Sequence, residues 1–310
     1  MPRVIECQAQ ETRCLDDVIA AIAEAGFDAR DDASIDHAAR CLRHLGNDPD
    51  FLGDLILDQL RDRHRQGPDT SAYGAQSIML SGPRNGFFLR ANIWPSPGDH
   101  AFRASGAGSF VYGVPHDHNF DFLTLGYFGP GYVSDYYEYD YQTVSGWQGE
   151  AAGLRFIERS TLSPGKLLLY RAHLDVHCQL PPQSMSVSLN VMGIDAAQGW
   201  HDQYRFDPAS DTITAILNPT STETFLRLAV GLGGAEAQDV AERFGRSHPS
   251  DRMRLASYEA RALLADPAGQ DALWREAERS GSRMVAVEAK ARRRELAQVS
   301  TLHPQPSPAP

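Results

Sequence analysis

The chain has 310 residues, more than the usual single domain of about 100 to 150, so it can bury one large core with flanking elements or form two domains. With 42% hydrophobic and 22% charged residues it has an ordinary globular composition, and no apolar run approaches the roughly 18 residues of a membrane span. A net charge of −11 argues against nucleic acid as a partner, because phosphate binding needs a basic surface. The first residues lack the apolar stretch of a secretion signal, so we expect a cytoplasmic protein.

Residues 1–72 are expected to form a helical N-terminal unit that packs on the core. Between residues 12 and 66 apolar side chains recur at helical spacing, beginning with Leu15, Val18, Ile19 and Ile22. A polar turn at residues 67–71 ends this pattern.

Residues 73–218 are expected to form a β-rich domain, because short aromatic and β-branched runs are divided there by Gly, Pro, Asn and Asp. Many short strands at this spacing predict a sandwich or barrel, of which a jelly roll is one solution. The fold class is therefore mainly β with helical flanks. The expected strands are 77–80, 86–94, 110–114, 120–127, 132–141, 154–162, 166–170, 176–180, 184–192, 203–206 and 212–217.

Residues 219–300 are expected to be helical again. Thr220 and Glu223 form the sequence signature of a capping box, Pro249 marks a further helix start, and Asp266-Pro267 is an N-cap and first-turn pair. The pair Arg252-Met253 recurs as Arg283-Met284, which resembles the repeats of HEAT-type solenoids and suggests a surface for a protein partner or a homodimer. The proline-rich residues 301–310 are expected to be a disordered tail.

Two histidine-rich stretches carry the chemistry. His116 and His118 are one residue apart, so on a strand both imidazoles face the same side while Asp117 faces the other. Such a pair can share one metal ion, although partly exposed histidines at a strand end would look the same. His173 and His177 follow about fifty residues later.

These stretches resemble the two motifs of the cupin superfamily over roughly residues 86–192. The first motif is His116-x-His118 followed by the glycines 126, 129 and 131; the second is a Pro164-Gly165 turn, an apolar strand and His177. The resemblance implies a cupin-type jelly-roll barrel in which His116, His118 and His177 hold a metal ion. Three imidazoles leave open positions, which suits iron(II), with zinc, nickel or manganese as alternatives. His173 is the competing donor, because it lies four residues before His177.

The first motif departs from many cupins, because Phe122 and Leu123 occupy the positions of their metal-binding glutamate. What remains resembles the three-histidine thiol dioxygenases, and this resemblance implies that Arg90 binds a substrate carboxylate. A rim arginine with a salt-bridge partner is the alternative. Tyr137 and Tyr139, in a tyrosine-rich run, are candidates for proton transfer, although packing at a sheet surface would also explain them.

The leading hypothesis is thus an iron-dependent oxygenase or dioxygenase that acts on a small polar substrate, such as an amino acid or a thiol. The first alternative is a redox-neutral lyase, isomerase or hydrolase that uses the same ligands. The second is a non-enzymatic metabolite sensor whose helical repeats bind a protein.

Overall fold

The computed structural model describes residues 1–66 and 76–302, and the chain divides into two compact units. The first comprises Met1–Tyr141, Ala151–Gly199 and Gln203–Thr212, and the second comprises Gln142–Glu150, Trp200–Asp202 and the chain from Ile213 onward. The segment boundaries expected from the sequence stay a prediction.

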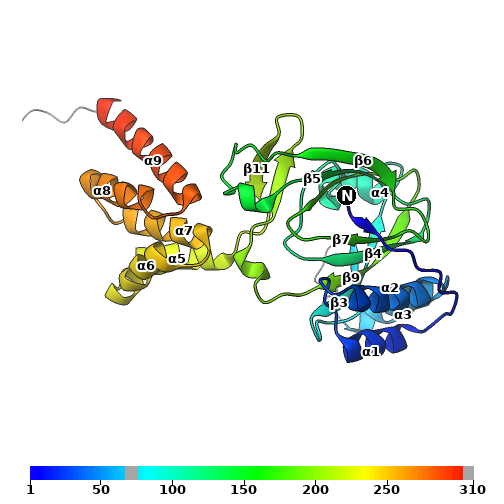
Figure 1. Ribbon diagram of the computed structural model, residues 1–310. Helices are drawn as coiled ribbons and strands as arrows, with labels where there is room; N and C mark the ends of the chain where they lie inside the picture. The colour runs from blue at the N-terminus through cyan, green and yellow to red at the C-terminus, as the bar shows by residue number, and fades with distance from the viewer. Residues whose placement is uncertain (67–75, 303–310) are drawn as a thin grey trace, which may run out of the picture. The chain divides into compact units, whose positions relative to one another are not determined.

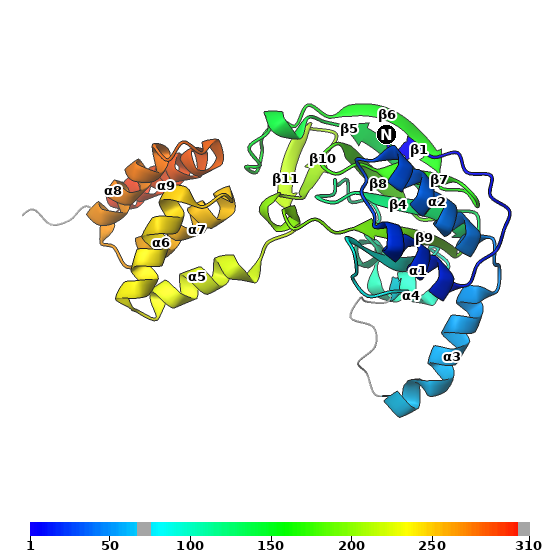
Figure 2. The same ribbon diagram turned by 60° about the horizontal axis from the view of Figure 1, so that its bottom comes forward.

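Three helices open the first unit, as predicted for residues 12–66: α1 (Leu15–Ala25), α2 (Asp32–Gly46) and α3 (Phe51–Gln66). Helix α2 is capped by the Asp31 side chain, which accepts a hydrogen bond from the Ala33 backbone N–H. Leu42 and Leu45 of α2 are fully buried in one core with apolar residues of the larger of two β-sheets, which are described below. Figures 1 and 2 show α1 and α2 on one face of that sheet. The predicted turn at 67–71 lies outside the described residues.

Two antiparallel sheets form the rest of the first unit. The larger has the strand order β1-β7-β4-β9-β3-β2, and the smaller has the order β6-β5-β8. The strands of the larger sheet are β1 (Arg3–Val4), β2 (Ser77–Met79), β3 (Phe87–Trp94), β4 (Phe122–Phe128), β7 (Leu167–Tyr170) and β9 (Ser186–Gly193). Those of the smaller are β5 (Val133–Glu138), β6 (Arg155–Thr161) and β8 (Asp175–Leu180).

The chain continues through β10 (Tyr204–Asp207), and β11 (Thr212–Ile216) lies where it leaves the first unit. Each of the expected strands except one overlaps a strand of the structure. Antiparallel sheets are therefore present, and closure into a jelly-roll barrel stays a prediction.

The strand expected at residues 110–114 is wrong. That stretch follows helix α4 (His100–Ser105) and contains the end of a 3₁₀ helix, η1 (Ala107–Phe110). Val111 and Gly113 then adopt left-handed backbone angles, with φ of 61° and 69°, which an extended strand does not allow. The aromatic side chains that suggested a strand are nevertheless buried, because this turn packs them under the sheet.

The larger sheet has a different core on each face. Along β3, Phe87, Leu89 and Ala91 belong to the core that includes α1 and α2, as period-two alternation requires. Trp94 belongs to a second, aromatic cluster on the opposite face, and Phe88 packs against it. This aromatic cluster consists of Trp94, Phe110, Tyr112, Phe122, Tyr132, Tyr136, Leu162, Leu168, Tyr170 and Met192.

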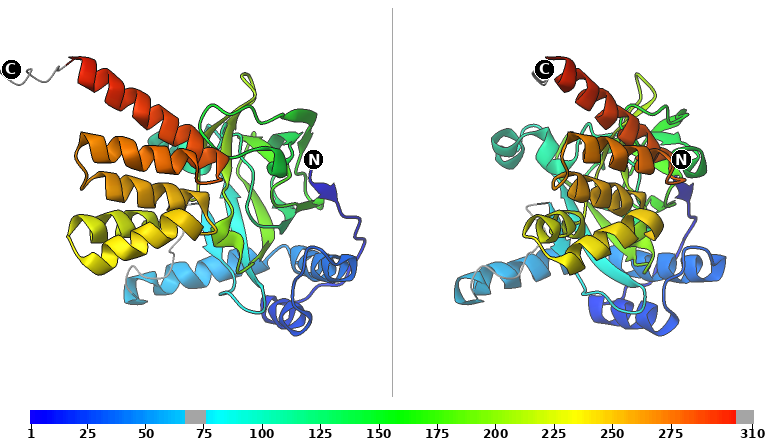
Figure 3. Two further views of the ribbon diagram at one scale, coloured as in Figure 1. Left: turned by 60° about the vertical axis from the view of Figure 1, so that its left-hand side comes forward. Right: turned by 90° about the vertical axis from the view of Figure 1, so that its left-hand side faces the viewer.

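The second unit is mainly helical, with α5 (Ser221–Gly231), α6 (Ala235–Ser247), α7 (Asp251–Ala262), α8 (Pro267–Glu278) and α9 (Arg283–Leu302). Figure 3 shows these helices stacked against one another within the unit. The predicted capping box of Thr220 and Glu223 is present, and Asp266 caps α8 ahead of Pro267. Two further 3₁₀ turns, η2 (Tyr141–Thr143) and η3 (Gln198–Trp200), complete the described elements.

The two Arg-Met pairs lie near the starts of α7 and α9, but the likeness to HEAT-type repeats has no support beyond this recurrence. A partner of these helices stays a prediction. Within the predicted tail, α9 runs on to Leu302, and residues 303–310 lie outside the described residues. In the described part of the chain, no helix combines the length and the apolar character that crossing a membrane requires.

Candidate metal centre

His116 and His118 lie on an extended segment that precedes β4 and belongs to none of the named strands. The segment is held against β8 by two backbone hydrogen bonds, in which the N–H groups of His116 and His177 each donate to the other residue's carbonyl at 3.0 and 2.9 Å. Because the backbone is extended, side chains still alternate, and the two imidazoles project to the same side. The structure thus brings together the three predicted ligands.

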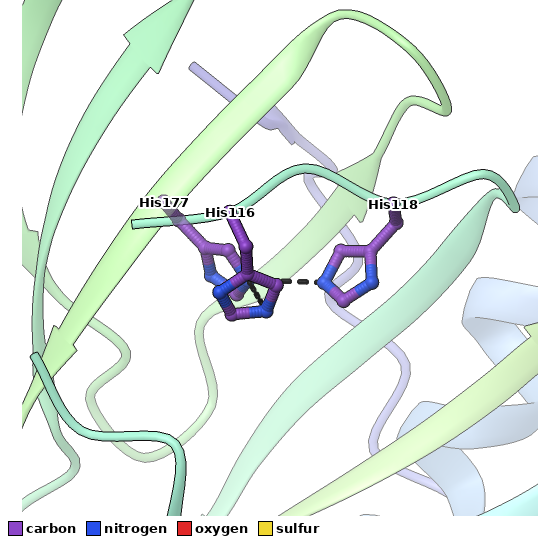
Figure 4. A group of neighbouring side chains, drawn as sticks. All are labelled: His116, His118 and His177. Atoms are coloured by element: carbon purple, nitrogen blue, oxygen red, sulfur yellow. Dashed lines mark hydrogen bonds between the residues drawn. The ribbon is translucent and has the colours of Figure 1, made fainter. Parts of the chain in front are cut away.

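The three imidazoles form a compact group, which we call the histidine cluster (His116, His118 and His177). Figure 4 shows the rings converging from two segments of the chain. Nε2 of His177 lies 3.0 Å from Nε2 of His118 and 3.2 Å from Nε2 of His116. All three residues are buried, with exposed fractions of 2 to 8%. In the described residues, this is the group of His, Cys, Asp and Glu side chains whose geometry suits a metal ion.

Burial makes these imidazoles neutral. Loss of solvation lowers the pKa of each, and it lowers the pKa of His118 and of His177 well below the ordinary value. The neighbouring histidines add to the effect, because a second positive charge would repel the first. Neutral imidazoles keep the lone pairs that a metal ion needs.

The backbone fixes the tautomer of His116. Its Nδ1 lies 2.8 Å from the Val114 carbonyl oxygen, and because a carbonyl only accepts, Nδ1 must carry the hydrogen. Nε2 is therefore the unprotonated nitrogen and faces the cluster. A hydrogen bond of this kind is typical of histidines that bind metal ions.

Asp117 anchors the segment from its other side. This carboxylate is fully buried, and it accepts hydrogen bonds from the Tyr139 hydroxyl and from the Tyr204 backbone N–H, both at 2.6 Å. Burial and the negative charge of Asp117 raise the pKa of Tyr139, which therefore stays protonated. Tyr139, predicted to be catalytic, thus binds the residue between the two histidines and not the histidine cluster itself.

Tyr137, the other predicted catalytic residue, is not brought to the histidine cluster. Across the two strands Tyr136 pairs with His177, so Tyr136 shares its face and Tyr137 lies on the opposite one. There the Tyr137 ring packs against Phe156, with 5.4 Å between centroids. The register of β5 against β8 determines this facing, and register is not a local property of the tyrosine-rich run.

Two tyrosines beside the cluster were missed. The Tyr170 ring lies 4.8 Å from that of His177, and its hydroxyl is 3.2 Å from the hydroxyl of Tyr136. Burial raises the pKa of Tyr136 to about 12 and that of Tyr170 well above its ordinary value, so both hydroxyls are protonated. The position of Tyr170 at the end of the apolar strand after Pro164-Gly165 is the signal that could have identified it.

Arg90 lies on the face of β3 that packs on the aromatic cluster, together with Phe88 and Trp94. Its positive charge is among the causes that lower the pKa of His118, so it acts on the histidine cluster electrostatically. Buried polar side chains accompany it on this side of the larger sheet, namely Asn92, Thr124, Ser188 and Asn190. Burying such polar groups is costly unless they form hydrogen bonds, and Asn92 accepts one from Ser77 while Ser188 accepts one from Trp94.

Phe122, with Leu123, stands where the cupin resemblance implies a glutamate. Its ring meets that of His118 edge-on, with 4.9 Å between centroids and an interplanar angle of 87°. On its other side it stacks on Tyr170 at 4.4 Å. An aromatic wall therefore replaces a carboxylate next to His118.

His173 is separate from the histidine cluster. Its backbone has a left-handed φ of 60°, and its N–H donates to the His118 carbonyl at 2.9 Å. The ring instead packs on Tyr141, with 4.3 Å between centroids. The geometry thus places His177 in the cluster and His173 behind it.

Neither a family model nor a curated protein matches this chain. Solved structures that resemble it include a salicylate 1,2-dioxygenase from Pseudaminobacter salicylatoxidans, at 11% identity and a TM-score of 0.26 over 46% of this chain and 33% of that one. A DMSP lyase from Ruegeria pomeroyi matches at 10% identity and a TM-score of 0.23, over 63% of this chain and 79% of the lyase. A cupin-like protein from Thermotoga maritima matches at 9% identity and a TM-score of 0.22, over 46% of this chain and 95% of that one.

This chain thus spans a third of the length of the salicylate dioxygenase. At these identities and TM-scores the similarity is too low to assign a family or an activity.

Proposed function

We propose that this protein is a cupin-type enzyme with one non-haem iron(II), which oxidises a small polar substrate of the amino-acid or thiol class with dioxygen. The observation that carries the proposal is the histidine cluster, three buried neutral imidazoles in which Nε2 of His177 lies 3.0 Å from Nε2 of His118 and 3.2 Å from Nε2 of His116. Nitrogen ligands of this number suit iron(II) and leave coordination positions for other molecules.

The donor set fits a metal ion on independent grounds. The three imidazoles are buried and in contact with one another, and the His116 tautomer already directs a lone pair into the cluster. A structural zinc site typically has four Cys or His ligands, whereas the group in the described residues contains three histidines and no further His, Cys, Asp or Glu. When bound, the ion supplies a template and a redox centre for substrate and oxygen.

The surrounding residues have separate roles in this proposal. Arg90 binds the anionic group of the substrate, because a guanidinium donates charge-assisted hydrogen bonds to a carboxylate and this one lies on the sheet face that carries the aromatic cluster. The Tyr136 and Tyr170 hydroxyls hold protons beside His177 and can donate a hydrogen bond to a bound anion. The aromatic cluster excludes water from the same space.

The same three imidazoles also bind zinc, nickel and manganese, so the metal needs a direct test. Protein purified without added metal would be compared with the His116→Ala and His177→Ala variants by elemental analysis. His173→Ala is the matched control, because this histidine lies outside the cluster. We expect the control to keep its metal and both cluster variants to lose it; full stoichiometry in both cluster variants would contradict the proposed site.

The activity is tested by oxygen uptake. The iron-loaded protein is screened in air against a panel of amino acids and thiols, with the His177→Ala variant as the blank. We expect one class of substrate to support oxygen consumption. Turnover of a substrate without oxygen consumption would instead establish the redox-neutral lyase, isomerase or hydrolase.

A further inference from the structure

Gln179 lies next to the histidine cluster. It follows His177 by two residues on β8, so both side chains project from the same face of the strand. Its amide Nε2 is 3.4 Å from Nε2 of His177, and only 4% of the residue is exposed. A neutral amide is therefore buried beside three neutral imidazoles.

The carbonyl oxygen of this amide lacks a partner. Gln179 Oε1 is buried, and no residue in the described part of the chain forms a hydrogen bond with it. Native proteins rarely bury such an oxygen unsatisfied, because it has lost its hydration without compensation. A rotation of the amide by half a turn exchanges oxygen and nitrogen, so the oxygen can also occupy the position 3.4 Å from His177.

The spacing matches that of ligands around one ion. With bonds of about 2.1 Å, adjacent ligand atoms lie about 3.0 Å apart in an octahedral site and about 3.4 Å apart in a tetrahedral one. The two spacings within the histidine cluster are 3.0 and 3.2 Å, and the spacing from Gln179 to His177 is 3.4 Å. The side-chain amide of Gln179 thus lies as far from Nε2 of His177 as one metal ligand lies from the next.

We propose that Gln179 is a fourth, neutral metal ligand, which binds through Oε1 the divalent ion held by the histidine cluster. The proposal rests on the metal site of the proposed function. It gives the unpaired Oε1 of Gln179 a partner, because a metal ion accepts the lone pairs of this oxygen more strongly than a hydrogen-bond donor does. It also supplies, from β8, an oxygen donor that Phe122 and Leu123 cannot supply from β4.

The test uses the full-length protein loaded with cobalt(II), whose visible absorption reports on the ligands, and a chelator competition that gives the dissociation constant. Gln179→Leu should change the spectrum and weaken binding by about 10- to 100-fold. Gln179→Glu, which keeps an oxygen donor, should bind cobalt(II) at least as tightly as the wild type. Cys178→Ala is the matched control, because the adjacent side chain faces away from the cluster.

If Gln179→Leu does not fold, Gln179→Met takes its place, because methionine has a similar length but offers no oxygen. Wild-type affinity and spectrum in the Leu or Met variant, together with loss of binding in His177→Ala, would overturn the role of Gln179 and leave the histidine site intact. A wild-type protein that binds no cobalt(II), or a His177→Ala variant that binds it fully, would overturn both.

Discussion

The hydrogen bond between Tyr139 and Asp117 gives a quantitative test of how the histidine cluster is held. Tyr139→Phe removes one hydroxyl and keeps the ring, which packs on Phe206 with 5.0 Å between centroids. The lost bond is 2.6 Å long, joins a 4% exposed residue to a fully buried carboxylate, and has a charged acceptor. Bonds of this kind contribute about 1.5 to 3 kcal/mol to the free energy of unfolding.

The same substitution should weaken metal binding, because Asp117 connects His116 to His118. Loss of a residue that orients metal ligands typically costs about 10- to 100-fold in affinity. Urea unfolding of the metal-free protein and a zinc competition titration measure the two effects. Tyr137→Phe is the matched control, and it should change the free energy of unfolding by less than about 0.5 kcal/mol, because Tyr137 packs on the opposite face.

Two results would refute this reasoning. One is a Tyr139→Phe variant that matches Tyr137→Phe in both measurements, and the other is a variant that loses turnover while its stability and metal affinity stay at wild-type values. The second result would restore the catalytic role that the sequence suggested for Tyr139.

The remaining predictions concern pH and Arg90. Burial lowers the pKa of each imidazole of the histidine cluster, so the unfolded chain binds protons before the folded protein as pH falls. The free energy of unfolding of the metal-free protein should therefore be full above about pH 6.5 and decline below it. The decline should reach up to about 1.4 kcal/mol per pH unit for each imidazole. Urea unfolding at pH 7.5 and 5.5 measures this slope; an equally steep slope in His177→Ala would contradict the assignment. Arg90→Gln should raise KM about 10- to 100-fold for an anionic substrate found by oxygen uptake, with Arg90→Lys intermediate, because a charge-assisted bond is lost. An unchanged KM in Arg90→Gln would exclude Arg90 from binding.

Local physics accounts for the parts of the fold that the sequence predicted. Helical periodicity located the helices between residues 12 and 66, and Thr220 with Glu223 marked a helix start, because a cap is made by neighbours in sequence. The strands followed from short β-branched runs between turn residues. The exception at 110–114 shows the limit of this method, since a left-handed residue at Val111 has no sequence signal.

The facing of the tyrosines depends on register, and this is why the sequence alone does not determine it. Whether Tyr136 or Tyr137 lies beside His177 depends on how β5 pairs with β8, and the pairing of β5 with β6 shifts by one residue between these two tyrosines. A slip of one residue moves a side chain to the other face of a sheet. No feature of the tyrosine-rich run itself determines that choice.

The histidines and Gln179 differ in the same way. Histidine is a rare residue, and the spacing of these three matches that of metal ligands, so the sequence alone indicated a metal site. Glutamine is common, and Gln179 stands out only because its buried Oε1 has no hydrogen-bond partner among the described residues. With Phe122 in place of a carboxylate and Gln179 as a neutral donor, the proposed ligands carry no charge. A divalent ion in such a site would keep its full charge and attract anions. We therefore expect an anionic substrate at the proposed site.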